Sequence, residues 1–300
     1  MNRLMTDGVP SELCGKVVTP LQKKETPTTR NNIRPIVLEE TLPKILFGVL
    51  AQRLESLLWA KRVLHPAQQA FRTDGSTLNC AVMAKLFQER VERDGGSVYG
   101  VDMDVSRAYD TVPFELVRAS LRRVRMPERM TKLVLDYLEQ ATATVRVHGK
   151  MYAEHTFDIN AGVPQGSAIA PILFNIALDA MVSQLADRFD TVSAESPHSD
   201  TMLIVYADDV RLMATSTPQK VADMVSAAGS WLTTVDMTFS TTAGKNVTWR
   251  SQRCRRRPTR CRRATRRSSP STSPDPTARP RTGRTWRRTT TDDATTRPAA

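Results

Sequence analysis

Two apolar runs separated by adjacent carboxylates constrain this chain more than any other feature. Met202 to Tyr206 is suited to a strand, and a second apolar run begins at Val210. So few residues lie between the runs that they predict a tight hairpin with Asp208 and Asp209 at its tip. Two unit charges about 4 Å apart repel by roughly 4 kcal/mol at an effective dielectric near 20. Two interpretations follow: a solvated turn, where Asp is common, or a site for a divalent cation that offsets the repulsion.

The net charge of the chain lies in its last fifty positions. The sequence of 300 residues has a formal charge of +12. Residues 251–300 hold 15 Arg and three Asp, whereas the first 250 residues hold 28 basic and 28 acidic residues. Residues 251–300 also contain no Leu, Ile, Val, Phe, Met or Tyr. Such a segment cannot bury enough apolar surface to offset the entropy of ordering, so it is predicted to be a disordered tail rich in Arg, Thr, Pro and Ser.

Two origins fit this tail. Arg clusters neutralise phosphates without reading sequence, which is typical of a nucleic-acid-binding segment. A shifted reading frame would also produce such a composition, and the abrupt change near Trp249 favours this second origin.

Cysteine spacing and hydropathy exclude several protein classes. Cys14, Cys80, Cys254 and Cys261 lack the paired spacing of a zinc site or a disulfide framework. The start of the chain is polar, and no apolar run is long enough to span a membrane. An intracellular protein without a membrane partner is expected.

Hydrophobic periodicity predicts a mixture of helices and strands. Single strands are expected at 17–21, 33–38 and 98–105, and a hairpin at 143–160. Helices are expected from 41, from 77 to about 93, and at 114–125, 129–139 and 218–234. Ser76 or Thr77 is expected to cap the second helix.

Two further helix predictions concern burial. In the helix that begins at Thr41, the residues expected to face the core are Ile45, Leu46, Val49, Leu50, Leu54, Leu57 and Leu58. A helix with Pro171 in its first turn is apolar on most sides and is expected to be buried under a sheet. Ser167 is a candidate cap for that helix.

Three other stretches carry polar groups next to these elements. Asp102 and Asp104 are two apart in a strand, so both point to one face. Residues 161–167 form a loop rich in turn formers with a single amide side chain, Gln165. The carboxylates of Asp104, Asp208 and Asp209 could therefore meet where adjacent strands end. Two divalent ions bound there would support phosphoryl transfer. Arg34 lies beside a basic loop that either clamps polyphosphate or is ordinary charged surface.

The order of these stretches resembles a known family. Val101-Asp-Met-Asp104-Val-Ser-Arg-Ala-Tyr109-Asp110, Gly162-Val-Pro-Gln165-Gly166-Ser and Tyr206-Ala-Asp-Asp209 resemble the successive core motifs of reverse transcriptases. The fingers motifs of the non-LTR (LINE-type) retrotransposon branch are similar to Arg34-Pro35-Ile36, Lys44-Ile45-Leu46 with Arg53-Leu54, and Gln69-Ala70-Phe71-Arg72 with Ser76-Thr77. The resemblance covers residues 15–250 and, within that branch, points to elements inserted in spliced-leader RNA genes.

The resemblance implies an α+β right-hand polymerase. Its fingers-like region would span 1–95, and its palm would span 96–250, with an antiparallel sheet backed by helices. The family continues with a helical thumb, whereas here the composition changes at about 250, so fingers and palm without the thumb are expected.

The resemblance also implies the site residues. Asp104, Asp208 and Asp209 would hold two Mg²⁺ ions, with Asp104 preferred to Asp102 because it lies five residues before Tyr109. The ring of Tyr109 would pack under the incoming sugar and exclude a ribose 2′-hydroxyl. Gln165 and Gly166 would line the nucleotide and template side, Arg34 would bind the triphosphate, and Lys245 would protonate the departing pyrophosphate.

The implied function is an RNA-directed DNA polymerase of a non-LTR retrotransposon, acting in the nucleus at the site of insertion. Its partners would be an RNA template, a DNA primer or target, and dNTP. Two alternatives remain open. One is a truncated, inactive remnant that binds nucleic acid only through its basic tail. The other is a different palm polymerase, such as a group II intron maturase or a viral RNA polymerase, and Tyr109 with Tyr206-Ala-Asp-Asp209 argues against the viral enzyme.

Overall fold

A computed structural model describes residues 8–22, 33–193, 196–241 and 246–251 of the chain. All of these belong to one compact unit, residues 1–254. Lys245 and, apart from Ser251, the predicted tail lie outside the described residues. The boundary between the fingers-like region and the palm, at residues 95 and 96, stays a prediction.

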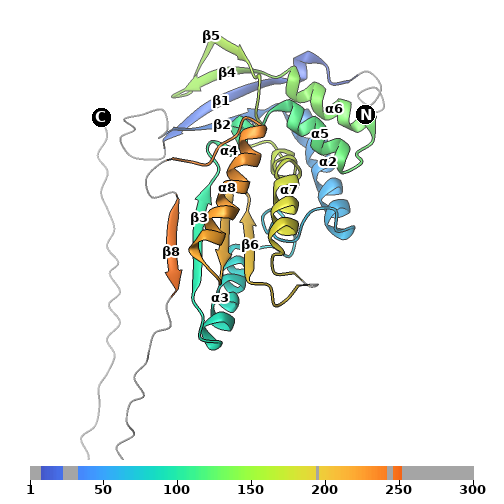
Figure 1. Ribbon diagram of the computed structural model, residues 1–300. Coiled ribbons are helices and arrows are strands. Elements are labelled where there is room, and N and C mark those ends of the chain that lie inside the picture. Colours follow the sequence, from blue (N-terminus) through green and yellow to red (C-terminus); the bar gives the residue numbers. More distant parts are fainter. Residues whose placement is uncertain (1–7, 23–32, 194–195, 242–245, 252–300) are drawn as a thin grey trace, which may run out of the picture. The chain divides into compact units, whose positions relative to one another are not determined.

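The chain combines helices with two largely antiparallel sheets, which confirms the α+β class (Figure 1). In chain order the elements are a 3-10 turn at Ser11–Leu13, β1 (Gly15–Gln22), β2 (Ile33–Glu39), α2 (Thr41–Ala60), α3 (Thr77–Arg93), β3 (Val98–Asp104), α4 (Ala108–Thr111), α5 (Phe114–Arg123), α6 (Glu128–Glu139), β4 (Thr142–Val147), β5 (Lys150–Asp158), α7 (Ala170–Phe189), β6 (Thr201–Tyr206), β7 (Asp209–Ala214), α8 (Pro218–Thr234) and β8 (Val247–Ser251). None of the described helices is long and apolar enough to cross a membrane.

One four-stranded sheet has the order β2-β1-β4-β5. β1 runs antiparallel to β2, with Lys16 opposite Glu39, and parallel to β4. The expected hairpin of β4 and β5 is confirmed, and most of β5 is exposed to solvent. This sheet, which we call the fingers sheet, therefore joins strands from before and after residue 95.

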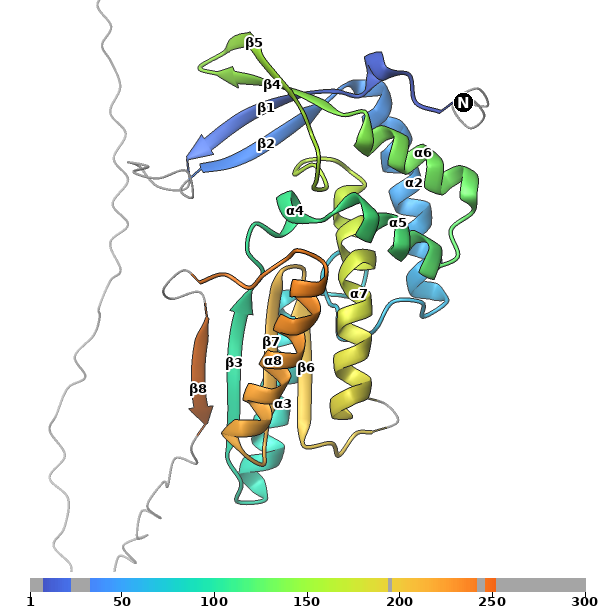
Figure 2. The same cartoon turned by 45° about the horizontal axis from the view of Figure 1, so that its top comes forward.

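The second four-stranded sheet, called the palm sheet here, has the order β6-β7-β3-β8 and is antiparallel throughout. Because side chains alternate along a strand, its two faces pack against different helices. On one face, residues of β3, β6 and β7 contact α3 through Val98, Met202, Ile204, Met213, Ala84, Phe87 and Val91. The opposite face contributes to the main core with α7 and α8 (Figure 2).

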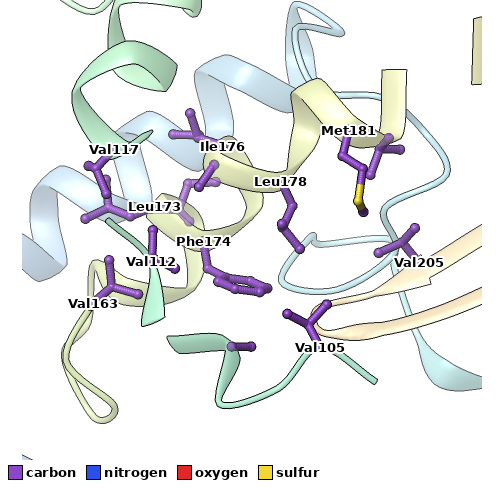
Figure 3. Packing of buried hydrophobic residues seen from close by; sticks show 14 of the residues in the cluster. Val105, Val112, Val117, Val163, Leu173, Phe174, Ile176, Leu178, Met181 and Val205 are labelled. Carbon is purple, nitrogen blue, oxygen red and sulfur yellow. The ribbon is translucent and has the colours of Figure 1, made fainter. Parts of the chain in front are cut away.

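The apolar sequence of α7 places it in the centre of that core, as predicted. Figure 3 shows Leu173, Phe174, Ile176, Leu178 and Met181 of this helix among Val105, Val112, Val117, Val163 and Val205. The prediction that Ser167 caps the helix is wrong. The N-cap position is Ile169, without a side-chain cap, because Ser167 lies two residues earlier, where its backbone N–H donates to the Pro164 carbonyl.

The predicted buried face of α2 is only partly correct. Leu50, Leu54 and Leu58 are buried, but Ile45 is 60% and Leu57 50% exposed. Phe47, fully buried and stacked on Tyr137 at 4.1 Å between ring centroids, lies on the buried face instead. The helix is apolar on several sides, so periodicity alone does not select the buried face.

Candidate active site

The palm sheet brings the three predicted metal ligands to one end. Asp104 ends β3 and faces Asp209, the first residue of β7. Directly opposed residues in an antiparallel pair have Cα atoms about 4.5 to 5.5 Å apart. Asp208 lies in the β6–β7 turn, and its carbonyl accepts a hydrogen bond of 3.1 Å from the N–H of Val105. Residues more than 100 positions apart in the sequence are therefore neighbours here.

Asp102 shares the face of β3 with Asp104, but it has a different partner. Arg211, opposite Asp102 in the register, donates from Nε and Nη2 to the two carboxylate oxygens at 2.5 and 2.9 Å. A bidentate guanidinium pair of this kind satisfies the carboxylate. The pairing supports the choice of Asp104 over Asp102 as the candidate ligand.

The backbone at the end of β3 is anchored by a later segment. Ser240 donates its N–H to the Asp104 carbonyl at 2.7 Å, and Ser106 donates to the Thr238 carbonyl at 2.8 Å. The N–H of Asp104 donates to Asn246 Oδ1 at 3.5 Å. The next residue back in the sequence, Lys245, lies outside the described residues, so its predicted role stays a prediction.

Tyr109 lies between the palm core and the acidic turn. Its ring stacks on the buried Phe174 of α7, with centroids 4.8 Å apart and planes at 15°. Burial, and then the nearby charge of Asp208, raise the pKa of the Tyr109 hydroxyl. The side chain therefore presents a neutral ring beside Asp208.

The loop that carries Gln165 contacts both α4 and the fingers sheet. Gln165 Nε2 donates to Asp110 Oδ1 at 3.1 Å, next to Tyr109, and the Gln165 carbonyl accepts from the N–H of Val37 in β2 at 2.8 Å. A Cβ on Gly166, whose φ is 113°, would lie 2.5 Å from the Val37 carbonyl oxygen. The close approach of loop and strand thus requires glycine.

Arg34 lies on the same strand as Val37 and is exposed. The described contacts link its strand to the palm through Gln165 rather than through the guanidinium. Its predicted contact with phosphate stays a prediction.

The sequence interpretation missed two residues at this site. From the sequence alone, Arg211 is interpreted as a surface charge, and Gln68 as part of a polar loop. In the structure Gln68 is 2% exposed and its side chain contacts the backbone of Ala207. The sequence does place Gln68 directly before Gln69-Ala70-Phe71-Arg72, which resembles a family motif. That position does not reveal that Gln68 contacts Ala207.

Within the described ranges, no group of three or more His, Cys, Asp or Glu side chains is placed so that it could hold a metal ion. The chemistry of the candidate donors still fits a hard divalent cation, because Asp104, Asp208 and Asp209 offer carboxylate oxygens. Asp208 also contributes negative charge beside Tyr109.

Solved structures with a similar fold include telomerases. The chain superimposes on apo telomerase of Candida tropicalis, truncated from its C-terminal domain, with a TM-score of 0.59 at 15% identity, covering 84% of this chain and 54% of that chain. Telomerase of Candida albicans in complex with a fragment of telomeric RNA gives a TM-score of 0.56 at 14% identity, covering 80% of this chain and 43% of that chain. These likenesses support the fingers and palm architecture.

Sequence comparison gives the family. A family model described as reverse transcriptase (RNA-dependent DNA polymerase) matches residues 21–252. The Pol polyprotein of the type-1 retrotransposable element R2 of Popillia japonica is 28% identical over 212 residues, which are 70% of this chain and 29% of that relative. The RNA-directed DNA polymerase from the mobile element jockey of Drosophila melanogaster is 26% identical over 192 residues, 64% of this chain and 20% of that relative. The chain therefore belongs to the reverse transcriptase family, in its non-LTR (LINE-type) retrotransposon branch.

Proposed function

We propose that this chain carries the catalytic centre of an RNA-directed DNA polymerase, which joins a dNTP to a DNA 3′ end on an RNA template. The observation that supports this proposal is the register of the palm sheet. Asp104 faces Asp209, and Val105 bonds the Asp208 carbonyl, at one end of the sheet. The chain spans less than a third of the R2 relative, so activity, template and primer are all part of the proposal.

Reverse transcriptases use divalent metal ions, and we assign two Mg²⁺ ions to this site. Asp104, Asp208 and Asp209 would supply the protein ligands. Mg²⁺ is commonly bound by one or two carboxylates plus substrate phosphates, so the dNTP would complete the coordination. When bound, the ions would activate the attacking hydroxyl and neutralise charge on the leaving phosphate.

The other candidate residues would bind and orient the nucleotide. The Tyr109 ring, held by Phe174, would lie against the sugar and leave no room for a 2′-hydroxyl. Gln165 and Gly166 would line the nucleotide and template side, since their loop bonds both α4, beside Tyr109, and β2 of the fingers sheet. Arg34 would bind the triphosphate, because a guanidinium matches phosphate geometry. Lys245 would donate the proton that the leaving pyrophosphate takes up.

The partners follow from the same chemistry. Reverse transcriptase relatives bind RNA templates and DNA, and for this chain we propose an RNA template, a DNA primer or target, and dNTP. Action in the nucleus, where an element inserts, and membership of the spliced-leader-gene branch rest on the sequence resemblance alone.

A second candidate function is a remnant that binds nucleic acid without catalysis. The observation in its favour is that the whole net charge of +12 belongs to residues 251–300. Binding through such a segment would be indifferent to sequence and would weaken steeply with salt.

Replacement of Asp208 distinguishes the two functions. Asp208→Asn should lower Mg²⁺-dependent dNTP incorporation on a primed RNA template by about a hundredfold or more, since metal-ion stabilisation contributes several kcal/mol. Asp223→Asn, on the exposed side of α8, is the matched control and should retain activity. Circular dichroism should show the same fold in all three proteins. Activity that survives Asp208→Asn would refute the assignment, and an inactive wild type that still binds RNA would favour the remnant.

A further inference from the structure

The amide side chain of Gln68 is buried against the β6–β7 turn. Its Oε1 accepts hydrogen bonds from the N–H groups of Ala207 and Ala70, each at 3.0 Å. Its Nε2 donates to the Ala207 carbonyl at 3.5 Å. One side chain therefore contacts both backbone polar groups of the residue that precedes Asp208.

Backbone bonds hold Gln68 at this place. Val205 in β6 donates to the Ala67 carbonyl at 2.9 Å and accepts from the N–H of Gln69 at 2.8 Å. Gln68 thereby forms a parallel bridge with Val205 at the outer edge of the palm sheet. The carbonyl of Ala70 accepts from the buried Asn175 of α7 at 2.9 Å. The segment is fixed by both β6 and α7.

Ala207 has a conformation that needs such support. Its φ is 55°, in the left-handed region. Holding a non-glycine residue there costs about 1 to 3 kcal/mol, and the conformation persists only where the surroundings determine it. A glutamine amide is both donor and acceptor, so it satisfies the N–H and the C=O of Ala207 together. A hydrocarbon side chain of similar size would satisfy neither.

We propose that Gln68 is a positioning residue that holds Ala207 in its left-handed conformation and thereby fixes the direction of Asp208. The catalytic consequence rests on the proposed function of Asp208, whereas the effect on the turn does not. Gln68 acts through the backbone and contacts no substrate.

The test compares Gln68→Met with Gln69→Met. Methionine preserves the length of the side chain and removes the amide. Gln69 is the matched control, because its side chain donates to Pro66 within its own segment, at 2.7 Å, and not to the turn. Three quantities are measured: hydrogen exchange of the amides of residues 203–210, affinity for Mn²⁺ with dTTP by electron paramagnetic resonance, and kcat and KM for incorporation.

Gln68→Met should speed exchange at 203–210 and weaken Mn²⁺–dTTP binding by about tenfold to a hundredfold, the range typical of residues that orient metal ligands. The loss of activity should appear in kcat, with KM for the primed template unchanged. Adding Ala207→Gly should restore part of both losses, because glycine adopts positive φ without strain. Gln69→Met should match the wild type.

The other possible results would contradict either the positioning role of Gln68 or the proposed function. Wild-type exchange at 203–210 in a folded Gln68→Met protein overturns the positioning role, as does an equal change in Gln69→Met. If Gln68→Met does not fold, Gln68→Asn takes its place, since its amide is one methylene too short to reach Ala207. Loss of folding in both variants would show a purely structural role and overturn the proposal. An inactive wild type rejects the proposed function, while the exchange measurement still decides the role of Gln68.

Discussion

Among the described residues, each of the two sheets carries an ion pair between directly opposed residues, one pair exposed in part and the other buried. In the palm sheet, Arg211 binds Asp102 in a bidentate pair at 2.5 and 2.9 Å, and both side chains are 37% exposed. In the fingers sheet, Lys16 Nζ lies 3.9 Å from Glu39 Oε1, and the side chains are 0% and 1% exposed. The bidentate pair is partly exposed to solvent, whereas the pair with the longer N–O distance is buried.

The consequence of burial appears in the pKa of Lys16. Burial lowers the pKa of Lys16 to about 8, although the charge of Glu39 opposes the shift. The Lys16 ammonium lies 3.6 Å from the ring centroid of Tyr137, whose own pKa is raised by burial and then by Glu39. The fingers sheet thus buries an ion pair, and removing these charges from water costs free energy. The palm sheet keeps its pair beside Asp104, where solvent has access, at little cost.

Breaking the buried pair should give the largest effect on stability. Lys16→Met leaves the Glu39 carboxylate buried without its cation, which should lower the free energy of unfolding by about 3 to 5 kcal/mol. Urea unfolding followed by circular dichroism measures the change. The double variant Lys16→Met/Glu39→Gln should recover most of the loss, because no buried charge remains. A loss below about 1 kcal/mol in the single variant would mean that the buried pair behaves as a surface pair does.

The parts of the fold that follow from the sequence are those that depend on residues close together in the chain. A helix was predicted over about 218–234 and is confirmed as α8, with Pro218 in its first turn and Thr217 capping it by accepting from the Lys220 N–H. The β6–β7 hairpin was predicted because its two apolar runs are close in the sequence. These are local signals, and local signals can be read without a partner.

Features that depend on distant partners were missed. β8 is a strand because it pairs with β3, and Trp249 fills the space over Gly100, where a Cβ would lie 2.3 Å from the ring. Lys16 and Glu39 are 23 positions apart, and Arg211 is 109 from Asp102. At the candidate site, the apolar runs pointed to Asp208 and Asp209, and the motif resemblance selected Asp104 over Asp102. Gln68 was not found, because its contact with Ala207 depends on a bridge to a distant strand.

A change of pH should alter the stability of the wild type relative to Lys16→Met. The size of this effect should lie between those of breaking the buried pair and the half-exposed pair. In the unfolded chain Lys16 has its ordinary pKa of 10.5, but in the folded chain the pKa is about 8. Between these values the unfolded chain binds a proton that the folded chain has released, so the contribution of Lys16 to stability rises with pH. From pH 8 to pH 9.5 the wild type should gain about 2 kcal/mol relative to Lys16→Met. Urea unfolding of both proteins at the two pH values measures this gain, and a constant difference would contradict it.

The smallest effect is expected when the half-exposed pair is broken. Asp102→Asn keeps the size of the side chain and removes its charge, so it should lower the free energy of unfolding by less than about 1 kcal/mol. Because Arg211 occupies both carboxylate oxygens of Asp102, dNTP incorporation should stay within about threefold of wild type. Asp104→Asn, two residues along the same face of β3, is the matched variant and should lose activity with the same small change in stability. A loss above about 3 kcal/mol in Asp102→Asn would show that water does not weaken this pair. Retained activity in Asp104→Asn, with loss in Asp102→Asn, would transfer the ligand assignment to Asp102.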